Sequence, residues 1–260
     1  MDGMMIVTLI TLGLVGGCAS GLLGIGGGIL MTPLLLYVPP ALGLNPLGMK
    51  AVAALTMAQG LSGSVSGTAV HRKFRHFDAA LVLRMGMSMG TASLLGAVLS
   101  SRASDQSLQG IFAAMALAAA ALMLKPLQGS DNDEFRAEVT LNTWLAVIFG
   151  LGVGFLGGMV GQGGAFIVLP VMLHVLRVPT RMAIGSSLGV VFFSSAAGFV
   201  GKVATNQMPW LAATAMVAGA VPGARIGALL SRRVRTPYLR LALSILIAIT
   251  AIRMSWEVIR

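Results

Sequence analysis

Two glycine-rich segments are the parts of this chain whose residue types and spacing could do chemistry. They run Gly-Ile-Gly-Gly-Gly at 24–28 and Gly-Gln-Gly-Gly at 161–164, and a proline follows each at the same distance, Pro33 and Pro170. Such glycine runs interrupt a helix and let the backbone turn with positive φ, which leaves N–H groups unpaired at the start of the next helix. Unpaired donors and the positive end of a helix dipole together favour an anion. We therefore expect an anion to bind the backbone at Gly26, Gly27, Gly28, Gly163, Gly164 and Ala165.

Polar side chains near these segments could orient the bound anion. In the second half, Gln162 belongs to the glycine segment, and Ser186 and Ser187 begin the following predicted helix, where hydroxyls can donate to an oxyanion. The first half lacks this hydroxyl pair and offers weaker candidates, which are Lys50, Thr56 and Gln59. Two alternatives stay open. The glycines could serve only close helix crossing, and the serines could bond only to the preceding turn of their own helix.

The composition indicates an integral membrane protein. Hydrophobic residues make up 56% of the 260 residues and charged residues 10%, so a water-soluble domain with an ordinary polar surface is excluded. Ten apolar stretches follow one another, and eight approach the roughly 20 residues that a membrane span needs. The two short stretches, 29–44 and 166–178, come directly after the glycine segments. The sequence therefore predicts an all-α, polytopic protein of the bacterial inner membrane.

The chain contains two copies of one unit. When 24–36 is aligned with 161–173, the glycines at 24, 26 and 27 coincide with those at 161, 163 and 164, and the proline and the last leucine also coincide. Later positions match after small changes in loop length, among them Leu55 with Leu188 and Ser64 with Ser195. We divide the chain into a first transmembrane repeat, 1–127, a polar linker, 128–138, and a second repeat, 139–260. Each repeat is expected to hold a glycine-broken helix or re-entrant hairpin followed by about three spanning helices.

Basic residues in the loops predict the orientation of the copies. In the first copy they concentrate at 71–76, after the third apolar stretch, whereas in the second copy they concentrate one loop later, at Arg232, Arg233 and Arg235. If both basic loops are cytoplasmic, the copies have opposite orientations, the linker is cytoplasmic and both termini lie outside. This inverted arrangement is the one we favour. The alternative is a continuous, kinked first helix in each copy, which gives two parallel sets of four spans.

The charged residues favour an anionic substrate. All eight acidic residues lie at termini, in loops or at predicted helix ends, and the net charge is +10. No proton-carrying carboxylate and no acidic cage for Na⁺ is evident at mid-membrane. The basic residues are scattered over short loops, which excludes a nucleic-acid site, and the single cysteine, Cys18, excludes an internal disulfide and a cysteine metal site. We expect no metal, no cofactor and no enzymatic centre.

We expect three groups of residues to have structural roles. A small-residue seam for close helix packing is expected at Ser88, Ala92 and Gly96 and at their counterparts Gly219, Gly223 and Gly227. The matching pair Ser64 and Ser195 is assigned to helix packing. Lys202 is expected at the membrane interface, together with Arg177 and Arg181.

The motifs resemble those of the sulfite exporter TauE/SafE family, also called the toluenesulfonate uptake permease family. They are Gly-Leu-Leu-Gly-Ile-Gly-Gly-Gly-(x)4-Pro at 21–33, Gly-Met-Val-Gly-Gln-Gly-Gly-(x)5-Pro at 158–170 and Pro-(x)3-Ala-Ile-Gly-Ser-Ser-Leu at 179–188, and the resemblance covers nearly the whole chain. It implies a multi-pass transporter of sulfur-containing anions such as sulfite, sulfonates or related organic acids. Where the family has Gly-Thr-Ser, this chain has Gly-Ser-Ser at 185–187 but Val-Ala-Ala at 52–54.

We therefore expect a secondary transporter for a small anion, working in the lipid bilayer by alternating access. The alternative is an anion channel or a uniporter for small carboxylates. The sequence leaves open whether the protein is a monomer or a homodimer, which anion it carries, and in which direction.

Overall fold

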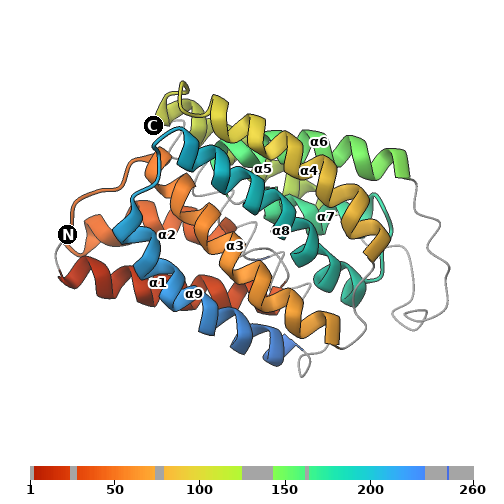
Figure 1. Ribbon diagram of the computed structural model, residues 1–260, viewed down its shortest axis with the longest axis horizontal. Coiled ribbons are helices and arrows are strands. Elements are labelled where there is room, and N and C mark those ends of the chain that lie inside the picture. The colour runs from red at the N-terminus through yellow and green to blue at the C-terminus, as the bar shows by residue number, and fades with distance from the viewer. Residues whose placement is uncertain are drawn as a thin grey trace.

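The computed structural model describes residues 3–23, 28–73, 79–124, 143–161, 164–231 and 245. These residues form helices and short connections, with no strand among them, so the all-α prediction is confirmed for the described part of the chain. The helices are α1 Gly3–Leu23, α2 Gly28–Ala41, α3 Met49–Lys73, α4 Ala79–Leu99, α5 Asp105–Leu124, α6 Thr143–Val160, α7 Ala165–His174, α8 Thr180–Ala204 and α9 Trp210–Ser231. Figure 1 shows them as an elongated bundle with most long helices running along its length.

Six of these helices are long and apolar enough to cross a membrane, namely α1, α4, α5, α6, α8 and α9. Tryptophans open α6 and α9, at Trp144 and Trp210, and both are exposed, as expected for side chains at the membrane–water interface. Exposed apolar side chains such as Val7, Leu95 and Leu211 cover the outside of the long helices, where lipid would contact them. Helix α3 has 25 residues but carries more polar side chains than the six spans.

Two short apolar helices, α2 and α7, follow the glycine segments, as predicted. At the second interruption, Gly161 has φ 91° and Gly164 has φ 71°, and α7 then runs for only ten residues. Positive φ is strained for any residue with a side chain, so the backbone reversal requires glycine here. At the first interruption, α1 ends at Leu23 and α2 begins at Gly28, while 24–27 lie outside the described residues.

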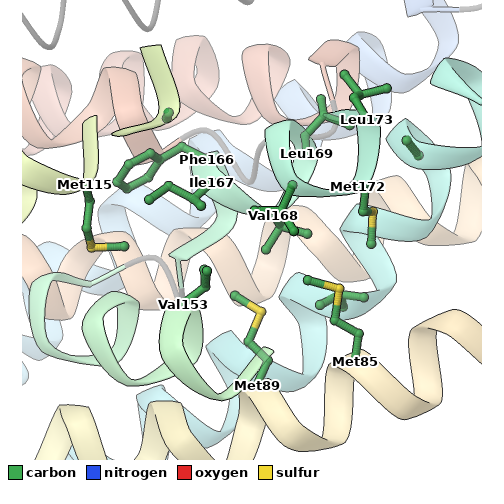
Figure 2. Close-up of a cluster of buried hydrophobic side chains, with 14 of the residues drawn as sticks. Met85, Met89, Met115, Val153, Phe166, Ile167, Val168, Leu169, Met172 and Leu173 are labelled. Atoms are coloured by element: carbon green, nitrogen blue, oxygen red, sulfur yellow. The ribbon is translucent and has the colours of Figure 1, made fainter. Parts of the chain in front are cut away.

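Helix α7 is held inside the bundle by apolar contacts on every side. All its residues from Ala165 to Leu173 are buried. Phe166 packs against Phe112 of α5 with ring centroids 5.3 Å apart. Figure 2 shows α7 side chains between Met115 on one side and Met85 and Met89 of α4 on the other. A short helix with so much buried apolar surface is fixed in place, which gives the preceding break a rigid support.

Two glycine seams join the halves of the chain. On α1, Gly13, Gly17 and Gly21 lie against the backbone carbonyls of Met216, Ala220 and Ala224 of α9 in turn. On α6, the backbones of Met85, Met89 and Ser93 of α4 face Gly150, Gly154 and Gly158 in the same order. In both series the residue numbers of the two facing helices increase together, so α1 is parallel to α9 and α6 is parallel to α4. The predicted small-residue seam is confirmed, and its glycines Gly219, Gly223 and Gly227 face α1.

Helices α3 and α8 cross at the centre of the bundle and run in opposite directions, because Gly60 faces Ser195 whereas Met57 faces Gly198. Helix α3 is parallel to α1, since Gly63 faces Ser20 and Gln59 faces Gly16. The chain must therefore reverse between α1 and α3, as Figure 1 also indicates. A continuous kinked helix over α1 and α2 does not fit these contacts.

Candidate functional site

The second helix break is backed by α3. A Cβ atom on Gly161 would collide with the side chain of Thr56 and with the backbone of Ala53, so no larger residue fits without displacing α3. Gly164 is the N-cap of α7, and no side chain caps this helix end. The first N–H groups of a helix have no hydrogen-bond partner within the helix. The break thus combines a tight backbone turn with a helix N-terminus that lacks a side-chain cap.

A lysine lies next to this break in the interior of the protein. The Nζ atom of Lys202, near the end of α8, donates to Ser100 Oγ at 2.7 Å, to Gln207 Oε1 at 3.1 Å and to the carbonyl of Met159 at 3.3 Å. Ser100 Oγ itself donates to the carbonyl of Ala97 at 2.6 Å, so it accepts from the lysine. The three oxygen acceptors around Nζ match in number the three N–H donors of a lysine ammonium group.

Lys202 is predicted at the membrane interface; the structure places it in the last turn of α8 with its side chain inside the protein, 0% exposed. It is the one charged side chain that is fully buried among the described residues. The position near the end of an apolar helix suggested that the amine reaches solvent. Instead, the amine has three oxygen partners inside the protein. Ser100 after α4, Met159 of α6 and Gln207 after α8 provide one oxygen atom each. Met159 precedes Gly161 by two residues, so the charge lies beside the break.

A second lysine lies at the same end of the bundle. Lys50 Nζ donates to the carbonyl of Ser101 at 2.9 Å, next to the serine that binds Lys202. The nearby carboxylate of Asp105 accepts the backbone N–H of Met49 at 2.8 Å and so caps α3. Both lysines therefore have neutral oxygen partners within the described residues.

The two serines predicted from the second half are both buried in the first turns of α8. Ser187 Oγ donates to the carbonyl of Ile184 at 2.9 Å, which is the bond to the preceding turn that the sequence left open as an alternative. A serine with this bond can still accept a hydrogen bond. A role in donating to a substrate stays a prediction for both residues.

The remaining predicted residues are divided between the halves. Gln59 lies in the middle of α3 with 1% of its surface exposed, and both of its amide atoms lack a partner among the described residues. Gly28 begins α2 and Ala165 begins α7. Four predicted residues fall outside the described part of the chain, and these are Gly26, Gly27, Gln162 and Gly163.

Two serine hydroxyls, for which we predicted no chemical role, also lack a hydrogen-bond partner. The Oγ atoms of Ser20 and Ser195 are buried and have no hydrogen-bond partner among the described residues. Ser64, the counterpart of Ser195, differs because its hydroxyl donates to the carbonyl of Leu61 at 2.9 Å. Sequence spacing cannot distinguish a bonded hydroxyl from an unbonded one, so nothing in the pattern identified these two serines.

The six apolar helices define a multi-pass membrane protein, in which a lysine is buried beside an interrupted helix. Residues 9–254 match the family described as Sulfite exporter TauE/SafE, and the chain belongs to this family. The family covers nearly the whole chain, which confirms the resemblance drawn from the glycine motifs.

Curated relatives have the same character. A Bacillus subtilis protein called "Probable membrane transporter protein YunE" is 26% identical over 98% of both chains. A Xylella fastidiosa protein called "Probable membrane transporter protein" is 30% identical over 88% of this chain and 85% of its own. A third, "Probable membrane transporter protein MJ0441" of Methanocaldococcus jannaschii, is 22% identical over 95% of this chain and 94% of its own. No solved structure matches the chain.

Proposed function

We propose that this protein is a secondary transporter that carries a small sulfur-containing or organic anion, such as sulfite or a sulfonate, across the inner membrane by alternating access. The observation that carries the proposal is the buried amine of Lys202 beside the second helix break, which we take to be protonated when an anion is bound. Its partners among the described residues are all neutral. A buried charge without a counter-ion is costly, so an anion bound nearby would be stabilised.

The binding site in this proposal lies where α7 begins. Backbone N–H groups around Gly163, Gly164 and Ala165 bind the oxygen atoms of the anion, and the dipole of α7 adds to their attraction. The equivalent backbone at Gly26, Gly27 and Gly28 approaches from the first repeat. Five side chains then orient the anion or attract it into the site, and these are Gln162, Ser186, Ser187, Lys50 and Gln59.

Alternating access in this proposal depends on two repeats of opposite orientation. The matched seams support it: the carbonyl of Cys18 of α1 faces Gly227, and the carbonyl of Phe155 of α6 faces Gly96 in the equivalent way. The parallel pairs α1 with α9 and α4 with α6, together with the antiparallel pair α3 and α8, are the directions that an inverted repeat requires. Many transporters bind substrate at the interface of such repeats, between broken helices.

Reconstitution into liposomes tests the proposal. Uptake of sulfite, thiosulfate, sulfonates and short carboxylates would be measured separately, with and without a pH gradient. We expect saturable uptake of at least one sulfur-containing anion and exchange against the same anion inside. Flux that does not saturate and shows no exchange would identify a channel instead. Saturation by carboxylates alone would favour the carboxylate uniporter.

The role of the α8 hydroxyls can be tested in the same assay. Ser187→Ala should weaken substrate affinity while the variant remains folded in detergent. An unchanged half-saturation concentration would remove this hydroxyl from the site. It would also indicate that the bond to the Ile184 carbonyl is the role of Ser187.

A further inference from the structure

The middle of α3 carries the largest unpaired polar side chain in the described interior. Gln59 is 1% exposed, and neither its amide oxygen nor its amide nitrogen has a hydrogen-bond partner there. The amide faces α1, because a Cβ atom on Gly16 would collide with Gln59 Nε2. Met31 of α2 packs against the same glycine. The amide is thus enclosed by α1, α2 and α3.

Two unpaired hydroxyls flank the same turn of α3. A Cβ atom on Gly63 would lie 3.3 Å from Ser20 Oγ of α1, and one on Gly60 would lie 2.8 Å from Ser195 Oγ of α8. Gly60 is adjacent to Gln59, and Gly63 is one helical turn after it. Ser20 of α1 and Ser195 of α8 therefore approach residues 60–63 of α3, directly after Gln59. Glycines at 60 and 63 leave these groups close to the α3 backbone.

Several other buried hydroxyls among the described residues are bonded. Thr56 Oγ1 donates to the carbonyl of Val52 at 3.0 Å, and Ser93 Oγ donates to the carbonyl of Ser194 at 2.9 Å. Buried polar groups in proteins are nearly always paired, and an unpaired one costs free energy. Three unpaired side chains around one turn therefore indicate a partner that is not part of the described chain.

We propose that Gln59, Ser20 and Ser195 form a neutral oxyanion subsite, in which the amide N–H groups and both hydroxyls donate to the oxygen atoms of a sulfur oxyanion. This inference rests on the proposed function and names the side chains that recognise its substrate. The donor inventory fits such a ligand, since an amide nitrogen supplies two N–H groups and each hydroxyl supplies one O–H. A cation is disfavoured, because no acidic side chain is buried among the described residues.

The subsite exists once in the molecule. In the alignment of the two repeats, Ser195 corresponds to Ser64, whose hydroxyl is already bonded to the carbonyl of Leu61. Ser20 corresponds to Gly157, which has no side chain. Recognition by side chains is therefore asymmetric and belongs to α1 and α3 with one contribution from α8. This location differs from the second glycine segment, where the sequence favoured side-chain recognition.

The decisive variant is Gln59→Met, which keeps the length of the side chain and removes both amide groups. Binding of sulfite and thiosulfate would be measured by separate titrations of the purified full-length protein in detergent. We expect the dissociation constant of the bound anion to rise about tenfold or more. We also expect Tm without anion to rise, because the unpaired amide is gone. A purely structural glutamine would lower Tm on the same change.

Gln106→Met is the matched control, since Gln106 is exposed in the first turn of α5. It should change neither the affinity nor Tm. Equal anion affinity of the wild type and Gln59→Met would overturn the subsite and leave the proposed function standing. Absence of sulfite and thiosulfate binding by the wild type would overturn the subsite, whereas the proposed function would still be decided by uptake of sulfonates in the liposome assay.

Ser20→Ala and Ser195→Ala give a second test that does not depend on the folding of the methionine variant. Each removes one oxygen atom that has no partner in the described chain, so stability should be retained or increased. Each variant should weaken anion binding about threefold to tenfold. Unchanged affinity in both would mean that buried water, rather than the anion, occupies the hydroxyls, and would overturn the proposal.

Discussion

At the scale of residues, the interior of this protein contains bonded and unbonded polar groups with different consequences. The amine of Lys202 has three oxygen partners. Gln59 has none among the described residues. The lysine therefore contributes both a fixed charge and cohesion between helix ends, whereas the glutamine contributes only unused hydrogen-bonding capacity. Substitutions at the two positions should move stability in opposite directions.

Lys202→Met should lower both stability and transport. The change removes the buried charge and leaves the carbonyl of Met159 and Gln207 Oε1 without this donor, which costs roughly 1–3 kcal/mol for each buried group. We expect a lower Tm in detergent and an uptake rate reduced at least about tenfold. Lys50→Met, at a partly exposed lysine, is the comparison and should have the smaller effect on Tm. Normal uptake by Lys202→Met would separate the buried charge from the anion site.

Gly161→Ala should prevent normal folding of the second break. The φ angle of 91° is strained for alanine, by roughly 1–2 kcal/mol, and the new methyl group would meet Thr56 and Ala53. We expect low yield of monodisperse protein and loss of uptake. Gly110→Ala in α5 is the control, because a Cβ atom there has no neighbour within 4 Å. This control should keep Tm or raise it, since alanine favours a helix over glycine. A Gly161→Ala protein with wild-type Tm would contradict the strained turn.

At the scale of elements, two kinds of helix contact have different purposes. The α1–α9 and α4–α6 seams bring backbones together through glycines, without any large side chain between them. Helix α7 is instead held by large apolar side chains, including Phe166 against Phe112 of α5. In a bilayer, an apolar side chain gains little by leaving lipid for another helix. Helices therefore associate through the van der Waals contacts that close backbone approach provides. The seams therefore determine how the two halves are joined.

Gly154→Leu should separate α6 from α4. A Cβ atom at this position already collides with the backbone of Met89, so a leucine cannot be accommodated without moving one of the two helices. We expect the free energy of unfolding to fall by several kcal/mol, with a lower Tm, or the variant to fail to fold. Gly152→Leu on the same helix is the control, because a Cβ atom there has no neighbour within 4 Å and the residue is exposed. Thermal unfolding monitored by circular dichroism would compare them, and equal Tm values would argue against a tight seam.

At the scale of the whole molecule, the ends of helices from different halves meet. Gln207, after α8, donates to the carbonyl of Ala97 near the end of α4 at 3.3 Å. The loop between α4 and α5 and the loop between α8 and α9 therefore lie at the same end of the bundle. Two repeats in parallel orientation would have these loops on opposite sides of the membrane, whereas inverted repeats have them on the same side.

Labelling of single cysteines tests this topology. In a Cys18→Ser background, Arg102→Cys and Asn206→Cys introduce thiols at exposed positions in the two loops. We expect a membrane-impermeant maleimide to label both from the outside of intact cells. Labelling of one from outside and of the other only after cell lysis would contradict the inverted arrangement and favour parallel repeats.

Much of the fold could be predicted from local pattern. Apolar length predicts spanning helices, and glycine runs predict the breaks, because these depend on the residues themselves and on the bilayer. The break at Gly161 and Gly164, the short helix after it and the glycine seam at 219–227 were all predicted correctly. The division at 128–138 and the anion role of the predicted residues remain predictions.

The burial of Lys202 and the absence of partners for Gln59, Ser20 and Ser195 could not be predicted in the same way. Each depends on which atoms of other helices lie within about 3 Å, and sequence spacing along one helix carries no information on that. Composition and glycine pattern alone thus indicate a membrane protein with two interrupted helices, and they lead to the prediction of an anionic substrate. Only the packing of α1, α3, α4, α6 and α8 decides which polar groups are bonded and which remain available, because hydrogen bonds form between neighbours in space.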